Sequence, residues 1–201
     1  MGFGALRVLN DDTIAPASGF GAHSHKDMEI ITIVTRGAVT HQDSLGNMKT
    51  VSAGEVQTMS AGTGVTHSEK NISPSEPLTL FQIWIEPREK GIAPAYAQRA
   101  FDAQNQKNGF VLLVSPDARE GSLPIHQDAY ISQAVLDSAR LLPYRLKDPA
   151  HGVYVFVVEG AVKVEGEALN ARDAMEIQGV EEITITSEEA ARVLVIEVPL
   201  R

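Results

Sequence analysis

The 201-residue chain contains no cysteine. Disulfide bonds and thiolate ligands are therefore excluded, and any metal site must be built from histidine and carboxylate side chains. No run approaches the roughly 18 apolar residues of a membrane-spanning helix, and the first residues lack the charged and apolar regions of a secretory signal. We therefore expect a cytoplasmic protein that does not enter a membrane.

Basic residues are scarce relative to acidic ones. Seventeen Lys and Arg stand against 26 Asp and Glu, which gives a formal net charge of −9. This net negative charge disfavours electrostatic binding to phosphate backbones, so we expect no direct binding of nucleic acid. Any link to transcription would run through a protein partner. A hydrophobic content of 43% is sufficient for a sizeable core and excludes a disordered chain.

Helical periodicity of useful length is also missing. Short runs rich in Val, Ile and Thr recur instead between glycine-containing turns, which is typical of strands. These runs cover residues 30–35, 78–85, 110–115, 153–158, 183–186 and 193–198. The pattern predicts an all-β sandwich or barrel in which helix is limited to short pieces.

A weak internal repeat favours two similar β-domains. Residues 33–40 resemble residues 156–163, each with a strand, a glycine turn and a further strand, and residues 52–55 resemble residues 170–173. Two unrelated hairpins of similar composition would give the same match. The polar stretch 86–109 is typical of a connection between domains, and we place the domains at residues 1–100 and 101–201.

Two pairs of candidate metal ligands stand out in the first half of the chain. His23 and His25 are spaced i, i+2, and so are His67 and Glu69, which follow a glycine-rich turn at 60–64. Successive side chains of a strand alternate between faces, so each pair points to one side. Three imidazoles and a carboxylate form a mixed N/O set that suits iron, zinc, copper, nickel or manganese. A solitary H-x-H is often only a surface pair, but two matched pairs favour a metal site.

The repeat also predicts where a metal site is absent. With the offset that aligns the two copies, His23 and His25 fall opposite Leu146 and Asp148. The second copy therefore has no equivalent pair of imidazoles. We expect the metal site only in the N-terminal domain and a structural role for the other domain.

Several other residues are given structural roles. His41 and Asp43 share a strand face, and we expect a hydrogen-bonded pair in a hairpin, because no Ser or Cys nucleophile stands beside them. Trp84 alternates with apolar neighbours and is expected in the core or in a pocket wall. His151 precedes Gly152 in a predicted turn, so we expect it to be exposed to solvent.

The motifs together resemble those of the cupins and, more narrowly, those of the pirin family. His23-x-His25-x3-Glu29, followed by Gly37, is similar to the first cupin motif. The segment from Gly54 through His67 to Asn71 is similar to the second. The likeness covers nearly the whole chain. The segments that most resemble pirin sequences are residues 19–29, 41–47, 59–69 and 82–85.

The resemblance implies two tandem cupin-type jelly-roll barrels with one metal ion, usually iron, in the N-terminal barrel. The pirin ligands match His23, His25, His67 and Glu69, whereas Glu29, a ligand in many other cupins, would lie behind them and orient a ligand histidine. We expect Fe(II), with Zn, Cu, Ni, Mn or Co as alternatives. Pirin-like chains normally carry a segment ahead of the Met-Gly-Phe at residues 1–3, so we expect that this chain lacks it.

The bacterial pirins that the chain most resembles imply a quercetin 2,3-dioxygenase. Such an enzyme cleaves a flavonol, a small aromatic substrate, with O2 and releases carbon monoxide. Glu69 would act both as a metal ligand and as the general base that accepts the proton of the flavonol hydroxyl. The resemblance to eukaryotic pirins implies an alternative, a redox-sensing regulatory protein that acts through a protein partner. We expect a monomer.

Overall fold

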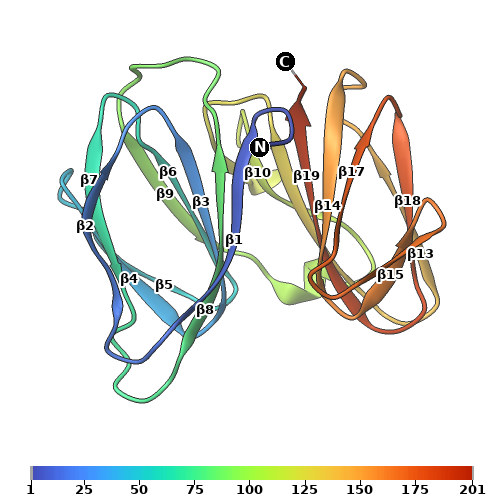
Figure 1. The fold of residues 1–201 in the computed structure, drawn as a ribbon, viewed down its shortest axis with the longest axis horizontal. Helices are drawn as coiled ribbons and strands as arrows, with labels where there is room; N and C mark the ends of the chain where they lie inside the picture. Colours follow the sequence, from blue (N-terminus) through green and yellow to red (C-terminus); the bar gives the residue numbers. More distant parts are fainter. Residues whose placement is uncertain (1, 201) are drawn as a thin grey trace.

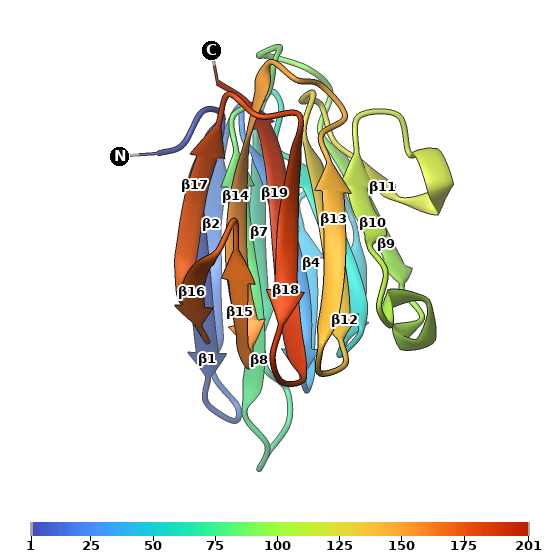
Figure 2. The same cartoon turned by 90° about the vertical axis from the view of Figure 1, so that its right-hand side faces the viewer.

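Four stacked β-sheets make up the computed structural model of the chain, which describes residues 2–200 (Figure 1). Figure 2, turned by 90°, shows the sheets one behind another with their strands in similar directions. Helix is confined to two short 3₁₀ turns, η1 (Ala103–Gln106) and η2 (Arg119–Gly121). No helix within residues 2–200 is long and apolar enough to cross a lipid bilayer. The predicted all-β fold is confirmed.

The N-terminal barrel pairs two sheets, an outer one in the order β2-β7-β4-β5 and an inner one in the order β1-β8-β3-β6-β9. The outer strands are β2 (Gly19–His25), β7 (Val65–Lys70), β4 (Ala38–Asp43) and β5 (Met48–Ser52). The inner strands are β1 (Leu6–Ile14), β8 (Leu78–Ile85), β3 (Glu29–Arg36), β6 (Glu55–Ser60) and β9 (Ala95–Ala100).

The C-terminal barrel is built in the same way, with its inner sheet in the order β11-β10-β12-β19-β14-β17 and its outer sheet in the order β13-β18-β15-β16. The inner strands are β11 (Leu123–Pro124), β10 (Val111–Ser115), β12 (Tyr130–Leu136), β19 (Ala191–Pro199), β14 (His151–Glu159) and β17 (Ala174–Gln178). The outer strands are β13 (Arg140–Arg145), β18 (Glu182–Ser187), β15 (Ala161–Val164) and β16 (Glu167–Asn170). All six strand-like runs of the sequence fall on strands.

The two barrels repeat one topology. The order β2-β7-β4-β5 recurs as β13-β18-β15-β16, and β1-β8-β3-β6 recurs as β12-β19-β14-β17. Gly37 and Gly160 occupy equivalent turns with φ of 76° and 74°. A Cβ at either position would approach the backbone at the start of the returning strand, at Leu78 and at Ala191 respectively. The match of residues 33–40 with 156–163 is therefore a true repeat and not a chance likeness of two hairpins.

The polar stretch 86–109 contains a strand that the sequence pattern does not indicate. Strand β9 lies within it and pairs with β6 at the edge of the first barrel. Apart from Tyr96, its residues are small or polar, so a search for runs of Val, Ile and Thr does not find this strand. The boundary between residues 100 and 101 stays a prediction.

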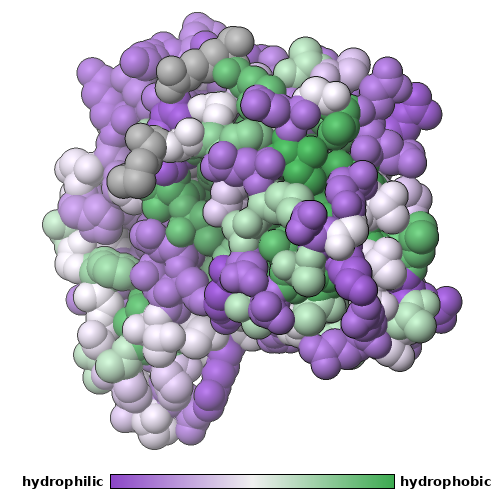
Figure 3. Space-filling view, turned by 45° about the vertical axis from the view of Figure 1, so that its right-hand side comes forward, coloured by the Kyte–Doolittle hydropathy of each residue, from purple (hydrophilic) through white to green (hydrophobic). Residues whose placement is uncertain are grey.

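The largest apolar cluster lies between the two inner sheets and joins the barrels. Phe81 of β8 and Phe156 of β14 meet there edge to face, with ring centroids 5.4 Å apart. A second cluster fills the C-terminal barrel, whereas the N-terminal barrel holds two smaller ones. On the face drawn in Figure 3, apolar residues lie in the middle and hydrophilic residues surround them.

The interior of the N-terminal barrel is polar where that of the other barrel is apolar. Thr32 on β3 pairs with Gln57 on β6 and with Gln82 on β8. At the equivalent place in the second barrel, Val155 pairs with apolar residues on both sides, Met175 and Val195. The polar groups separate the two small apolar clusters of the first barrel, and this interruption lies where the candidate ligands converge.

His151 is buried, so the prediction that it is exposed is wrong. The side chain is 5% exposed, and its Nδ1 lies 3.1 Å from Oε1 of the fully buried Glu197. The same carboxylate accepts hydrogen bonds from the Tyr144 hydroxyl and from the backbone amides of Lys147 and Asp148. These hydrogen bonds anchor the segment 147–151 to β19. They also explain why the carboxylate of Glu197 can be buried without a functional role.

Replacing Gly160 with alanine should destabilise the fold more than replacing Gly166. Both glycines have positive φ, so both substitutions cost the left-handed strain of about 1–2 kcal/mol. Only the Cβ at Gly160 would also collide with a backbone carbonyl, that of Ala190, whereas the Cβ at Gly166 meets nothing within 4 Å. Urea unfolding of G160A and G166A measures the difference, and equal losses would contradict the packing argument.

Candidate metal centre

Antiparallel pairing of β2 with β7 brings three of the predicted ligands together. His23 lies directly opposite His67 in the register, and paired residues of antiparallel strands share one face. The His23 and His67 ring centroids lie 4.5 Å apart, and the His25 ring lies 4.8 Å from His23 and 5.0 Å from His67. The ring nitrogens of these histidines that could bind a metal are all within 4.8 Å of one another.

A β-bulge in β2 adds an aromatic side chain to the same face. Phe20 is opposite Glu69 and His23 is opposite His67, so three steps along β2 correspond to two along β7. Without the bulge, residues three apart would point to opposite faces. Phe20 is 42% exposed, so its aromatic ring is accessible to solvent on the strand that carries His23 and His25.

Glu69 reaches the cluster from the buried side. Its carboxylate accepts hydrogen bonds from the amides of Gln57 at 3.1 Å and Gln82 at 2.9 Å. It forms a second group of possible ligands with His67 and His41, again within 4.8 Å. Burial raises the pKa of Glu69 above its ordinary value, partly offset by the hydrogen bonds from Gln57 and Gln82. His67 is the residue common to both groups.

A hydrogen-bonded chain behind His67 fixes the orientation of its imidazole. Asp43 Oδ2 lies 3.1 Å from His41 Nε2, and His41 Nδ1 lies 3.5 Å from His67 Nδ1. Because the carboxylate can only accept, His41 donates a hydrogen bond to it from Nε2–H. The other ring nitrogen of His41, Nδ1, can then accept a hydrogen bond from His67 Nδ1–H. This leaves the lone pair of His67 on Nε2, where a metal ligand needs it.

Nε2 of His67 is buried and has no hydrogen-bond partner among the described residues. Burial and the neighbouring imidazoles lower the pKa of His67 to about 3, so the ring is neutral at physiological pH. An unpaired buried acceptor costs free energy, on the order of 1–3 kcal/mol. A metal ion bound by this nitrogen would remove that cost, so the residues fit a metal site.

The tautomer of His23 is also determined by a hydrogen bond. Its Nδ1 lies 2.8 Å from the carbonyl oxygen of Gly21, and since a carbonyl only accepts, this nitrogen carries the proton. The lone pair of His23 is therefore on Nε2. A backbone carbonyl behind a ligand histidine is a common way to fix its tautomer.

The members of the cluster differ in their exposure to solvent. His23 is exposed and His25 is half-buried, whereas His67 and Glu69 are almost fully buried. Burial, followed by the charge of His23, lowers the pKa of His25. The ring of Trp84 lies 5.0 Å from that of His25, and Trp84 packs, partly buried, against the apolar cluster that contains Ile30 and Val65. A molecule in solution can reach the cluster from the side of β2.

Glu29 does not orient a ligand histidine, so that prediction is wrong. Its carboxylate accepts a hydrogen bond of 2.7 Å from Ser60, and burial raises its pKa, partly offset by Ser60 and His126. Neither of these partners is one of the three candidate ligand histidines. The cause is strand alternation. Glu29 shares a face of β3 with Ile31 and Ile33, which pack toward the other barrel, while Thr32 points to the site.

Sequence reasoning finds three of the converging histidines and overlooks the groups that support them. His41 and Asp43 do form the predicted pair, but the pair contacts His67 because β4 lies beside β7. The glutamines that hold Glu69 come from β6 and β8. The available signal was the polar residue in the middle of each apolar strand, at Gln57 and Gln82.

Two protein-family models match the chain. The pirin model covers residues 1–85, and the model of the quercetinase C-terminal cupin domain covers residues 112–198. The protein of Escherichia coli K12 named quercetin 2,3-dioxygenase is 46% identical over 199 residues, which is 99% of this chain and 84% of that protein. A pirin-like protein of Caulobacter vibrioides is 44% identical over 198 residues, 98% of this chain and 84% of its own length.

Solved structures agree with these relatives. The crystal structure of YhhW from Escherichia coli has a TM-score of 0.95 at 46% identity and covers 100% of this chain and 84% of its own. The structure of the bacterial pirin YhhW in complex with nickel(II) has a TM-score of 0.94 at 45% identity, with 100% and 85% covered. With both of its barrels matched as cupin domains and this identity over nearly its whole length, the chain belongs to the pirin family.

Proposed function

We propose that this protein is a metal-dependent dioxygenase that cleaves a flavonol such as quercetin with O2 and releases carbon monoxide. The metal ligands in this proposal are His23, His25, His67 and Glu69, and the ion is Fe(II). The observation that carries the proposal is the buried, unpartnered Nε2 of His67, which faces two further imidazoles on the solvent side. The name of the Escherichia coli relative and the nickel(II) complex of YhhW support it.

The donor set determines what a bound ion could do. Three imidazoles and one carboxylate are ligands that suit Fe(II), and His23, His25, His67 and Glu69 would hold the ion with coordination positions left for a substrate oxygen and O2. When bound, the ion would supply Lewis-acid polarisation of a substrate oxygen and one-electron chemistry with O2. Leu146 and Asp148 stand opposite His23 and His25 in the repeat, so the second barrel has no equivalent pair of imidazoles and the proposal assigns one ion per chain.

Glu69 is proposed to accept the proton of the flavonol hydroxyl. Burial raises the pKa of this carboxyl group, and a carboxylate with a raised pKa is a stronger base near neutral pH. Gln57 and Gln82 donate hydrogen bonds to the two carboxylate oxygens and hold them in position. The proton would thus move from the substrate oxygen to an oxygen of Glu69.

An aromatic substrate is supported by the open side of the site. Phe20 lies on the face of β2 that carries the histidines, and its ring is accessible to a planar ligand. Trp84 closes the other side against His25 and donates its indole N–H to Gln82. The ring of Trp84 against His25 and an accessible ring on β2 support the binding of a flat, apolar molecule such as a flavonol. A redox-sensing role through a protein partner stays a prediction.

Protein reconstituted anaerobically with Fe(II) should consume quercetin in air, whereas H67A should neither retain the ion nor turn over substrate. The substitution removes the ligand that is common to both groups of the cluster. Metal content is measured by mass spectrometry and turnover by the loss of flavonol absorbance, with metal-stripped protein as the control. Full metallation of the wild type without turnover would reject the dioxygenase and would leave metal binding intact.

Glu69→Gln should separate the role of Glu69 as a base from its role as a ligand. The amide preserves shape but accepts a proton poorly, so turnover should fall by about 100-fold or more. The measurement is kcat per bound metal ion, with metal content determined on the same samples. Unchanged metal content together with unchanged turnover would show that Glu69 is not the base.

His41→Phe should weaken metal binding by about 10- to 100-fold, as expected when the group behind a ligand histidine is lost. Phenylalanine keeps an aromatic ring against Tyr96, whose centroid lies 4.9 Å from that of His41, but offers no acceptor to His67 Nδ1–H. His41→Asn, which retains an acceptor near the position of Nδ1, should recover part of the affinity. Competition with a chelator measures the dissociation constants, and equal values for wild type and both variants would contradict this role.

A further inference from the structure

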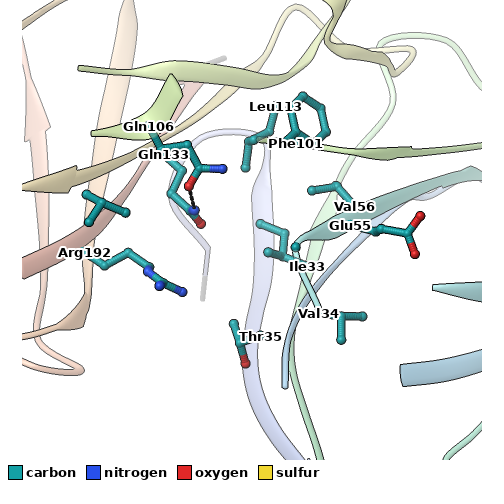
Figure 4. A pocket seen from close by; sticks show the side chains of 12 residues that line it. Ile33, Val34, Thr35, Glu55, Val56, Phe101, Gln106, Leu113, Gln133 and Arg192 are labelled. Atoms are coloured by element: carbon teal, nitrogen blue, oxygen red, sulfur yellow. Dashed lines mark hydrogen bonds between the residues drawn. The ribbon is translucent and has the colours of Figure 1, made fainter. Parts of the chain in front are cut away.

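A pocket of about 180 Å³ lies between the two barrels and is distinct from the metal centre. Ile33 and Val56, which line it, are on the opposite face of β3 and β6 from Thr32 and Gln57, which point to Glu69. Figure 4 shows residues of both barrels around this space. The lining residues are Ile33, Val34, Thr35, Gly54, Glu55, Val56, Phe101, Gln106, Leu113, Gln133, Val135 and Arg192.

Arg192 supplies a positive charge at one side of this pocket, and its only carboxylate neighbour among the described residues is Glu159, in a long ion pair. Its Nε is buried and has no hydrogen-bond partner among the described residues. The nearest carboxylate oxygen, Glu159 Oε2, is 3.9 Å from Nε, beyond hydrogen-bond distance. Figure 4 shows the guanidinium pointing from β19 toward the space between the barrels. Since Arg is always protonated, the group requires an acceptor.

Glu55 does not satisfy Arg192, although it also lines the pocket. Its carboxylate accepts hydrogen bonds from the Ser52 amide at 2.6 Å and from Gln98 Nε2 at 3.3 Å. Figure 4 shows the carboxylate pointing away from the guanidinium. The charge of Arg192 is therefore available to an anion that enters from solution, where the side chain is 33% exposed.

Two buried amides lie beside the guanidinium. Gln106 and Gln133 are 6% and 8% exposed, and Gln133 donates a hydrogen bond to Gln106. In Figure 4 the Gln106 amide nitrogen is on the side of Phe101 and Leu113. The pocket thus combines a cation and an amide donor with an apolar wall formed by Phe101, Leu113 and the aliphatic side chains of β3 and β6.

The size of the pocket limits the ligand. A volume of about 180 Å³ is below the roughly 300–1,000 Å³ of pockets for drug-sized molecules. It is close to the ~150 Å³ of an engineered apolar cavity that holds benzene. One aromatic ring with one carboxylate therefore matches the volume, the apolar wall and the charge, since guanidinium and carboxylate form paired hydrogen bonds.

We propose that the pocket between the barrels binds a single-ring aromatic carboxylate, with Arg192 pairing the carboxylate and Phe101 and Leu113 packing against the ring. The ligand contacts both barrels at once. It therefore stabilises the arrangement of the barrels by mass action, since it binds only when they are in place.

The test is a titration of the full chain, loaded with diamagnetic Zn(II), with benzoate, followed by methyl NMR and calorimetry. The expected result is saturable binding with shifts at Ile33, Val56 and Leu113, and small or no shifts at Ile30 and Val65 beside the metal centre. Benzyl alcohol, which lacks the charge, should bind more weakly. No binding of benzoate, or shifts confined to Ile30 and Val65, would overturn the proposal.

Arg192→Met tests the assigned contact, because methionine keeps much of the aliphatic stem and removes the charge. Affinity for benzoate should fall about tenfold or more, as expected for a hydrogen-bonded charge pair. Arg88→Met is the matched control, since Arg88 pairs with Asp128 on the surface. Thermal unfolding confirms that both variants are folded. Equal benzoate affinity in wild type and R192M would overturn the role of Arg192.

Discussion

Alternation of side chains across strands β3, β6 and β8 is the constraint on which the rest of the molecule depends. One face of these strands carries Thr32, Gln57 and Gln82 into the first barrel, where they surround Glu69. The other face carries apolar residues into the cluster between the barrels. A single sheet therefore serves two environments, and a shift of one residue in the register would exchange them.

The polar interior is tolerable because each of its members has a partner. Glu69 is held by the glutamines, Gln82 also accepts from Trp84, and Gln57 accepts from Tyr96. An unsatisfied group of this kind would cost about 1–3 kcal/mol. Among the described residues of the candidate centre, the buried side-chain atom without a partner is Nε2 of His67. A preorganised ligand site is expected to have this arrangement, in which the surrounding polar groups are hydrogen-bonded and the lone pair of the ligand atom, here His67 Nε2, is free.

Duplication allowed the two barrels to diverge in their interiors while keeping one topology. Where the first barrel has Thr32 between Gln57 and Gln82, the second has Val155 between Met175 and Val195. The second barrel gains a continuous apolar core, and its inner sheet covers the first. The interface also creates the pocket with Arg192, which neither barrel forms alone.

The sequence by itself determined the all-β class, indicated the repeat and showed which candidate ligands share a strand face, because i, i+2 spacing depends only on local backbone geometry. Tertiary structure decided the rest. The meeting of His67 with His23 and His25 needs β7 beside β2. The contact of His41 with His67 needs β4 beside β7, and the position of Phe20 needs a bulge in β2. Glu29 was misassigned because its motif does not reveal which face of β3 is turned to the site. Burial of His151 required its pairing with Glu197, 46 residues away in the chain.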